Sequence, residues 1–330
     1  MFFKETRIGY GPLSRKYGLL LDTIQSVEIV LANGTAVNAS STENQDLLFA
    51  IKGAGPSFGV VTQLSFKAQP QPSNTITFNY SLNGRTLEES VQTFIAYQDF
   101  IAQNPSYDLY PTLVFGSDGN NGVTFEFSGN YFGSEDDYNN LIKPLMDGFK
   151  IRDGDDTNIQ QDQDFIQGVE RTSGSLSELN VESENFYSKS LIINEKLQQD
   201  QIYSYFGYLF YDLQNAQNEG YGWYIIVDPY NGKINEVDES ATAFNHRDAL
   251  LTFQFFGYVG ESQQKLFDYV DGMVNSITDH PTDAYVNYVD PRLNDWQHLY
   301  YGNNYERLQQ IKSQVDPSNV FNFDQSIELL

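Results

Sequence analysis

Residues 75–80 read TITFNY, residues 110–115 read YPTLVF and residues 123–131 read VTFEFSGNY, and in the last of these apolar residues alternate with other residues. Alternation of this kind is typical of a β-strand that buries one face. Residues 86–103 (TLEESVQTFIAYQDFIAQ) and 135–149 (EDDYNNLIKPLMDGF) instead repeat apolar residues every three or four positions, as amphipathic helices do. The order strand-helix-strand-strand-helix predicts an α+β fold, in which helices back a large antiparallel sheet.

Downstream residues are expected to continue this architecture. Strands are predicted over residues 205–211, 223–227 and 250–258, and an amphipathic helix over residues 263–277. Residues 151–200 are rich in Asp, Gln, Ser and Asn and show weak periodicity. We predict loops and short helices for that stretch.

Upstream residues predict a smaller unit. Residues 24–31 form a candidate strand that enters a hairpin at Asn33-Gly34, and residues 44–52 and 60–66 form a candidate helix and strand. Two prolines in a polar run at residues 69–73 break regular structure and mark the clearest boundary. We therefore predict a first domain at residues 1–72, followed by a second part at residues 73–280 and a C-terminal segment at residues 281–330.

The charge balance restricts the possible partners. The chain has 19 Lys and Arg against 44 Asp and Glu, a formal net charge of −25. Such a field repels phosphate backbones and anionic lipid, so we expect no nucleic acid and no membrane partner, and a neutral substrate fits best. The chain has no cysteine, which excludes disulfides, thiolate nucleophiles and cysteine-based metal sites.

Targeting signals are weak in this sequence. No apolar run is long enough to span a bilayer, and the first residues lack the apolar core of a secretory signal, so the chain as written is expected to be cytoplasmic. Sequons at Asn33, Asn38 and Asn79 would indicate secretion, but a chain rich in Asn, Ser and Thr produces such triplets by chance.

Two short motifs suggest functions that their context excludes. Residues 53–59 (GAGPSFG) follow a helix and precede a strand, whereas a dinucleotide fingerprint requires the opposite order, so a tight turn is the simple alternative. His246-Arg247-Asp248 matches part of the kinase catalytic loop, but Phe253 occupies the position of the required Asn. A histidine held by its neighbours is the favoured interpretation, and no metal site is expected, because His280 and His298 lack ligand spacing.

Four segments together resemble the berberine-bridge branch of the vanillyl-alcohol-oxidase superfamily of flavin oxidases, and within it the fungal glucooligosaccharide oxidases. Residues 11–22 resemble the family's Gly-x-x-Ser-Arg-x-Tyr-Gly-Leu-x-x-Asp segment, residues 53–62 its Gly-Ala-Gly-x-x-Phe-Gly-x-Val-Thr segment, and residues 223–232 and 285–327 a substrate strand and the C-terminal signature. By this resemblance, residues 1–72 are the second half of a PCMH-type FAD-binding domain, residues 73–280 are a substrate-binding domain, and residues 281–330 return to the FAD-binding domain. The resemblance implies that FAD contacts Gly11, Ser14, Gly18, Leu19, Gly55, Phe58, Gly59, Val60 and Asn287.

The resemblance also implies a catalytic pair. Tyr288 is one of 23 tyrosines, and a free phenol with a pKa near 10 is a poor base unless a neighbour accepts its proton. Asp228 lies at the end of a predicted strand, directly before Pro229. An Asp in this position usually stabilises a turn. The resemblance implies instead that Asp228 pairs with the catalytic Tyr. The negative charge of a nearby carboxylate raises the pKa of a phenol. Asp228 therefore assists Tyr288 as a base only if a hydrogen bond lets it receive the phenolic proton. The implied sugar-binding residues are Tyr224, Gln254 and Tyr285.

The implied reaction is FAD-dependent oxidation of a carbohydrate's anomeric hydroxyl to a lactone, or of another alcohol, with O₂ as acceptor and hydrogen peroxide as product. The family's N-terminal FAD subdomain, with its flavin-bonded histidine, is not matched, so we expect an N-terminally truncated chain with weak FAD retention and doubtful activity. The alternatives are a non-catalytic scaffold and a carbohydrate-binding protein. Family members are extracellular, an expectation that the missing signal peptide opposes.

Overall fold

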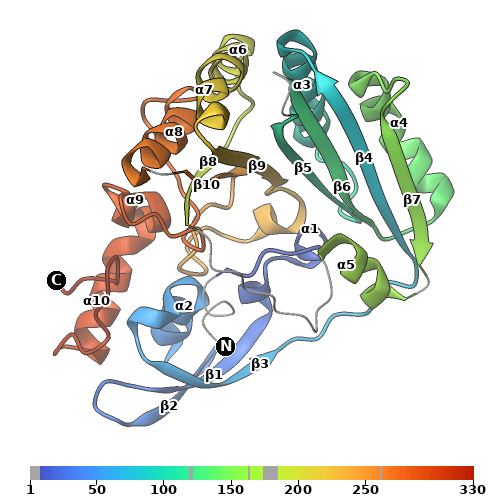
Figure 1. Cartoon of the computed structure of the whole chain (residues 1–330). Coiled ribbons are helices and arrows are strands. Elements are labelled where there is room, and N and C mark those ends of the chain that lie inside the picture. Colours follow the sequence, from blue (N-terminus) through green and yellow to red (C-terminus); the bar gives the residue numbers. More distant parts are fainter. Residues whose placement is uncertain (1–7, 119–121, 163, 174–184, 261) are drawn as a thin grey trace. The chain divides into compact units, whose positions relative to one another are not determined.

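The structure is a computed structural model that describes residues 8–118, 122–162, 164–173, 185–260 and 262–330 (Figure 1). The chain forms two compact units, each assembled from separate stretches of sequence. Unit 1 comprises Met1–Pro70, Lys233–Asp248 and Thr282–Leu330, and unit 2 comprises Gln71–Gly232 and Ala249–Pro281.

One stretch belongs to a different unit than the sequence pattern indicates. Residues 233–248 fall inside the predicted substrate-binding domain, but the structure groups them with unit 1. The reason is a set of hydrogen bonds over long sequence separations. Arg247 donates to both carboxylate oxygens of Asp22 at 3.0 and 2.8 Å, and Asn304 donates to the Thr242 carbonyl at 3.0 Å. Local sequence patterns carry no signal for such contacts.

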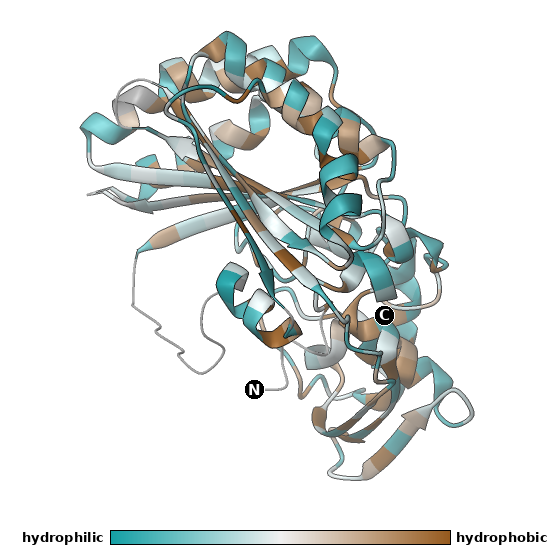
Figure 2. Ribbon diagram, turned by 90° about the vertical axis from the view of Figure 1, so that its right-hand side faces the viewer, coloured by the Kyte–Doolittle hydropathy of each residue, from teal (hydrophilic) through white to brown (hydrophobic). Residues whose placement is uncertain are grey.

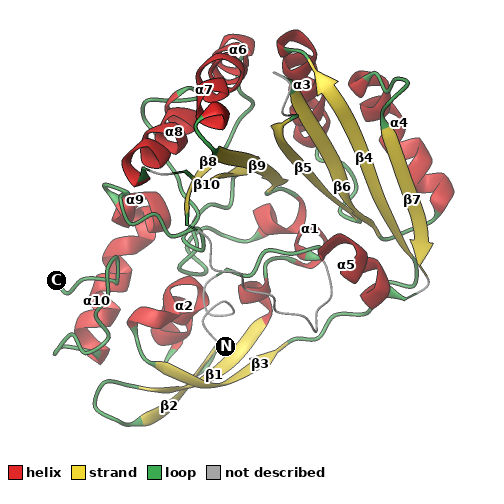
Figure 3. Ribbon diagram, viewed as in Figure 1, coloured by secondary structure: helices red, strands yellow, loops and turns green. Residues whose placement is uncertain are grey.

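Unit 2 is built on a seven-stranded sheet in the order β7-β4-β6-β5-β9-β10-β8, in which all neighbouring strands are antiparallel (Figure 3). This confirms the predicted α+β class with a large antiparallel sheet. The strands are β4 (Thr75–Arg85), β5 (Leu109–Ser117), β6 (Val123–Tyr131), β7 (Asp156–Asp162), β8 (Phe186–Ile193), β9 (Tyr221–Pro229) and β10 (Leu251–Val259).

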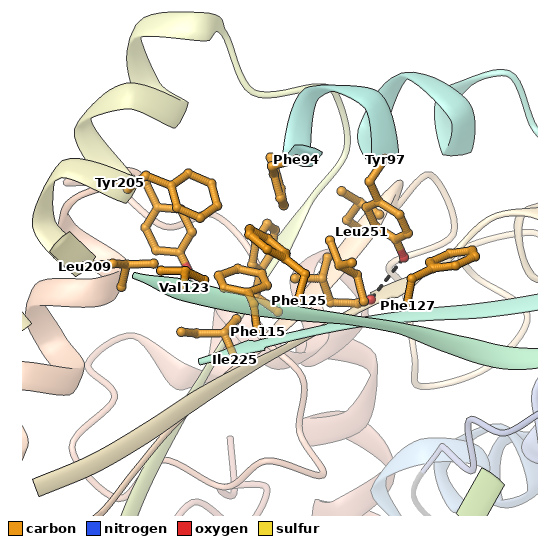
Figure 4. Close-up of a cluster of buried hydrophobic side chains, with 14 of the residues drawn as sticks. Phe94, Tyr97, Phe115, Val123, Phe125, Phe127, Tyr205, Leu209, Ile225 and Leu251 are labelled. Atoms are coloured by element: carbon orange, nitrogen blue, oxygen red, sulfur yellow. Dashed lines mark hydrogen bonds between the residues drawn. The ribbon is translucent and has the colours of Figure 1, made fainter. Parts of the chain in front are cut away.

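Helices cover one face of this sheet and bury an aromatic core against it (Figures 2 and 4). Helix α3 begins at a capping box, where the Thr86 hydroxyl and the Glu89 carboxylate each accept from the other residue's backbone N–H. The hydroxyl of Tyr97 on α3 donates to the Val227 carbonyl at 3.0 Å. The helices of unit 2 are α3 (Leu87–Ala102), α4 (Glu135–Phe149), α5 (Phe165–Ser173), α6 (Gln199–Gly207), the π-helix η3 (Tyr208–Asp212), α7 (Leu213–Asn218) and α8 (Gln263–Asn275).

The predicted strand over residues 205–211 is wrong, since this stretch is the end of α6 and the π-helix η3. Ile202, Tyr205, Phe206 and Leu209 are all buried, and their spacing matches one face of a helix. The aromatic composition of the stretch favoured a strand, but tertiary packing against α3 selected the helical pattern.

Two strands lie in the stretch predicted to be loops and short helices. β7 and β8 are the two edges of the sheet. Side chains on β7 are mostly exposed, so its sequence carries no hydrophobic alternation. Pairing with β4 and β10 therefore creates these strands, which local sequence did not indicate.

The face of the sheet that points away from α3, α4, α6 and α8 is called here the second face. Helix α5 lies on part of it, because Asn130 and Thr77 on this face both donate to the Gly168 carbonyl, at 3.2 and 3.3 Å. Gly168 is required there, since a Cβ would lie 2.5 Å from the Thr75 side chain. The second face of β9 and β10 carries the predicted substrate-binding residues of unit 2, Tyr224 and Gln254.

Unit 1 contains a three-stranded antiparallel sheet in the order β2-β1-β3, formed by β1 (Ile24–Val30), β2 (Ala36–Ser40) and β3 (Val60–Phe66). The predicted hairpin at Asn33-Gly34 is confirmed, and Gly34 has a φ of +80°. The remaining elements are α1 (Ser14–Tyr17), η1 (Leu20–Thr23), α2 (Gln45–Ala54), η2 (Gly55–Ser57), α9 (Trp296–Tyr301), η5 (Gly302–Asn304) and α10 (Tyr305–Val315). A short helix, η4 (Gly232–Glu236), begins where the chain passes from unit 2 to unit 1.

Candidate active site

Asp228 is a buried carboxylate near the end of β9, on the second face of the sheet. Its side chain is 7% exposed, and the Thr112 hydroxyl of β5 donates to Oδ1 at 2.8 Å. Burial raises the pKa of Asp228 to about 6, although the hydrogen bond from Thr112 acts in the opposite direction. A carboxylate with this pKa exchanges protons near neutral pH, which suits a group that accepts a proton during catalysis.

The predicted sugar-binding residues of unit 2, Gln254 and Tyr224, lie on the same face as Asp228. Antiparallel register places Gln254 of β10 opposite Ile226 of β9, and Phe256 opposite Tyr224. The rings of Tyr224 and Phe256 stack with centroids 4.7 Å apart and planes inclined by 20°. The structure therefore brings Asp228, Gln254 and Tyr224 onto one face of two adjacent strands.

The C-terminal signature forms a compact turn in unit 1. The backbone N–H of Tyr288 donates to the Tyr285 carbonyl at 2.9 Å, and the two rings meet edge to face with centroids 4.8 Å apart. Asn287 donates from Nδ2 to the Tyr285 hydroxyl at 3.0 Å, and its Oδ1 is buried without a hydrogen-bond partner among the described residues. Asp228 belongs to unit 2 and Tyr288 to unit 1, so their pairing stays a prediction.

The first predicted FAD segment is a hydrogen-bonded turn. The Ser14 hydroxyl accepts from the Gly11 N–H at 2.9 Å, and the Gly11 carbonyl accepts from the Ser14 N–H at 2.9 Å. Gly18 has a φ of +92°, and the N–H of Leu19 donates to the Asp22 carboxylate at 2.9 Å. A Cβ added at Gly11 would have no atom within 4 Å, so a ligand could approach the backbone there.

The second predicted FAD segment runs from Gly55 to Val60. Gly59 lies against β1 so closely that a Cβ would be 2.6 Å from the Val30 carbonyl oxygen. Phe58 is fully buried and its backbone N–H donates to the Gly55 carbonyl at 3.0 Å, whereas Val60 is 56% exposed. Beside this turn lies a cavity of about 100 Å³ lined by Gly53, Ala54, Pro56, Ser57, Val286, Val289, Tyr300, Tyr301, Phe323, Asp324 and Gln325.

One interaction near these segments was not predicted from the sequence, and another confirms a prediction. The Thr112–Asp228 bond depends on strand register, which no motif indicates. His246 Nδ1 lies 2.9 Å from the Asp283 carboxylate, which confirms that this histidine is held by a neighbour. Burial alone would raise the pKa of Asp283, but the hydrogen bond and charge of His246 hold it below the usual value.

A buried ion pair anchors the end of the chain. The Lys312 ammonium donates to the Asp316 carboxylate at 2.7 Å, and to the carbonyls of Ser57 and Phe321 at 2.8 and 2.9 Å. Its sequence signal is the spacing of four residues between Lys312 and Asp316. This pair joins α10 to the turn that carries the predicted FAD segment.

Comparison with known proteins gives a consistent family. Residues 284–328 match the family model described as berberine and berberine like. The FAD-linked oxidoreductase sorD of Penicillium rubens is 34% identical over 97% of this chain and 68% of its own length. The chain belongs to the berberine-bridge-like family of FAD-linked oxidoreductases.

Carbohydrate oxidases of this family are also similar. A xylooligosaccharide oxidase of Thermothelomyces thermophilus is 30% identical over 97% of this chain and 66% of its own length. The crystal structure of an Acremonium strictum glucooligosaccharide oxidase superposes with a TM-score of 0.87 at 27% identity, covering 98% of this chain and 70% of that one. The chain thus spans 66 to 68% of the length of the two relatives compared by sequence.

The residues of unit 1 fit the flavin cofactor of this family. The buried Oδ1 of Asn287, which lacks a partner among the described residues, can accept a hydrogen bond from a ligand N–H or O–H. The open backbone at Gly11 allows close approach of a large planar group. Across the described ranges no group of His, Cys, Asp and Glu is arranged to bind a metal, and no helix is long and apolar enough to cross a membrane.

Proposed function

We propose that this protein is an FAD-dependent oxidase that converts the anomeric hydroxyl of a saccharide to a lactone with O₂ as the final electron acceptor. The observation that carries the proposal is Asp228, a buried acid with a pKa of about 6 on a sheet face that also presents Gln254 and Tyr224. Carbohydrate oxidases among the relatives support the substrate class.

The chain's own residues would have three tasks. Gln254 and Tyr224 bind and orient the sugar, because an amide pairs with hydroxyls and an aromatic ring packs against the apolar C–H face. Tyr288 takes the proton of the anomeric hydroxyl. Asp228, which is mostly ionised at neutral pH, would take the phenolic proton of Tyr288 through a hydrogen bond, so that the phenolate can accept the proton of the anomeric hydroxyl.

When bound, FAD would supply the redox chemistry, as the acceptor of the hydride from the anomeric carbon and the source of the two electrons that, with two protons, reduce O₂ to hydrogen peroxide. Gly11, Ser14, Gly18 and Leu19 would hold FAD together with the backbone from Gly55 to Val60, and Asn287 would contact its ring. Loss of one proton and one hydride from the substrate balances formation of the lactone C=O bond.

Two measurements test the proposal. Visible absorbance of the purified protein, with and without added FAD, reports flavin binding, and peroxide release with glucose, xylose and their oligosaccharides reports turnover. We expect the Tyr288→Phe variant to bind FAD normally and to lose turnover. Absence of both flavin binding and peroxide, together with calorimetric binding of the same sugars, would instead support a carbohydrate-binding protein.

A further inference from the structure

Arg247, the middle residue of the triplet His246-Arg247-Asp248, is buried in unit 1, and its side chain is 4% exposed. Its two terminal nitrogens donate to both carboxylate oxygens of Asp22, at 3.0 and 2.8 Å. Nη2 also donates to the Thr242 hydroxyl at 2.8 Å, and Nη1 to the Ile234 carbonyl at 3.4 Å. The guanidinium is therefore fixed by its own stretch of chain, and from there it holds Asp22 with a pair of charge-assisted hydrogen bonds.

Asp22 in turn holds the backbone of Gly18 and Leu19, two of the predicted FAD contacts. The Leu19 N–H donates to Asp22 Oδ2 at 2.9 Å, and the Asp22 N–H donates to the Leu19 carbonyl at 2.9 Å. Gly18 has a φ of +92°, and a Cβ added there would lie 3.0 Å from the same Oδ2. The carboxylate of Asp22 therefore lies directly against a turn whose conformation favours glycine.

The shape of this turn depends on where the Asp22 carboxylate points. The turn leads into η1, which has only four residues, and helices this short depend on contacts beyond their own backbone hydrogen bonds. The side chain of Asp22 is 11% exposed, so water offers it few alternative partners. Two hydrogen bonds from one guanidinium fix both the position and the orientation of a carboxylate, whereas a single contact leaves it free to rotate. Arg247 therefore determines how Asp22 presents Oδ2 to Leu19.

We propose that Arg247 is a positioning residue for the flavin. Through Asp22 it holds the backbone of Gly18 and Leu19 in the conformation that FAD contacts, without touching the cofactor itself. This inference rests on the proposed function, because it assumes that FAD lies against Gly18 and Leu19. It also gives a role to residues 233–248, which the structure groups with unit 1 although they fall inside the predicted substrate-binding domain.

Amide hydrogen exchange tests this positioning without any cofactor. We measure exchange of the Leu19 amide by NMR in the full chain, as wild type, Arg247→Met and Arg247→Lys, the last of which keeps the charge but not the fork. Weakening of the bond to Asp22 should accelerate exchange of Leu19 about 3- to 10-fold, and more in Arg247→Met than in Arg247→Lys.

A second amide in the same unit serves as the reference for this measurement. The Phe58 N–H donates to the Gly55 carbonyl at 3.0 Å, and Asp22 takes no part in that bond. The Phe58 amide should therefore exchange at its wild-type rate in both variants. No change at Leu19 in either variant would overturn the proposal. Equal acceleration at Leu19 and Phe58 would also overturn it, because Arg247 would then support only the general stability of unit 1.

Flavin binding tests the consequence for the cofactor. The Kd for FAD, followed by quenching of flavin fluorescence, should rise about 10-fold in Arg247→Met and less in Arg247→Lys. The double variant Arg247→Met/Asp22→Asn leaves no buried carboxylate without a counter-ion. It should bind FAD no more weakly than Arg247→Met alone, because the effects of two residues that act through one another do not add.

A matched control removes another arginine–aspartate pair of unit 1. Arg307 donates to Asp46 at 2.6 Å, with side chains 42% and 69% exposed, and Arg307→Met should leave the Kd for FAD within about twofold. Equal FAD binding by Arg247→Met and the wild type would overturn the positioning role while leaving the oxidase proposal intact. If the wild type itself binds no FAD, the proposed function fails, and exchange of the Leu19 amide alone then decides whether Arg247 positions this turn.

Discussion

Replacing Lys312 by Met should destabilise unit 1 severely. The ammonium is fully buried and donates to three acceptors, the Asp316 carboxylate and the carbonyls of Ser57 and Phe321. Asp316 also accepts from the backbone N–H groups of Val320 and Phe321, at 2.8 and 2.9 Å. Methionine fills a similar volume but leaves a buried carboxylate without its counter-ion, which typically costs about 3 to 5 kcal/mol.

The chain offers an optical probe for each unit. It contains two tryptophans, Trp296 in unit 1, whose ring lies 5.7 Å from that of Tyr305 on α10, and Trp223 in unit 2. We would follow urea unfolding by Trp296 fluorescence in a Trp223→Phe background. The free energy of unfolding of unit 1 should fall by about 3 to 5 kcal/mol in Lys312→Met.

A matched control uses the same spacing at the surface. Lys143 and Asp147 on α4 form an ion pair four residues apart, with side chains 70% and 68% exposed. Lys143→Met should change the free energy of unfolding of unit 2 by less than about 1 kcal/mol. Fluorescence of Trp223 in a Trp296→Phe background reports that change.

A double-mutant cycle provides the decisive comparison. The double variant Lys312→Met/Asp316→Asn removes both the ammonium and the carboxylate, so no buried charge is left without a partner. Its free energy of unfolding should be about 1 to 3 kcal/mol higher than the value expected from adding the two single effects. Burial raises the pKa of Asp316, but the hydrogen bonds from Lys312 and from two backbone N–H groups outweigh this effect and hold the pKa below its usual value. The pair therefore contributes to the free energy of unfolding at neutral pH, and this contribution is lost as pH falls through the lowered pKa of Asp316. Strict additivity, or a Lys312→Met effect that persists undiminished in strong acid, would refute this account.

Three further predictions concern the candidate site. Asp228→Asn should remove the rise of kcat/KM with pH near 6. Because the native state holds the Asp228 proton more tightly than the unfolded state does, the variant should also stabilise unit 2 above pH 6. The gain in free energy of unfolding should be about 3 kcal/mol and should vanish below about pH 4, as urea unfolding at several pH values would show. Tyr288→Phe should lower kcat at least about 100-fold with little change in calorimetric sugar binding, and a kcat near wild type would exclude Tyr288 as the base. Gly59→Ala should cost about 1 to 3 kcal/mol in thermal unfolding, since its Cβ would meet the Val30 carbonyl, whereas Gly11→Ala should weaken FAD binding without that cost.

Sequence reasoning located most of the elements of the sheet. The predicted strands near 75–80, 110–115 and 123–131 pair as expected, and the helix at 86–103 starts at the Thr86 cap. These elements alternate or repeat apolar residues because one side of each is buried, so the period of burial is visible in the sequence. The strand predicted at 205–211 failed because aromatic residues suit strands and buried helices equally well.

The family likewise follows from short motifs alone. The segments at residues 11–22, 53–62 and 285–327 indicated an FAD-linked oxidase, and the family membership is now shown. The close packing of Gly59 against β1, in contrast, was not predicted, because the motif does not show which strand the turn approaches.

Tertiary structure alone decided which distant residues meet. The bond from Thr112 to Asp228, the contact of Arg247 with Asp22 and the stacking of Tyr224 on Phe256 all join strands or segments far apart in the chain. Local propensity acts over a few residues, whereas strand register and burial depend on the whole core. For that reason the composition and motifs of this chain establish its fold class and family, while the raised pKa of Asp228 and the contact of Arg247 with Asp22 emerge only after the chain has folded.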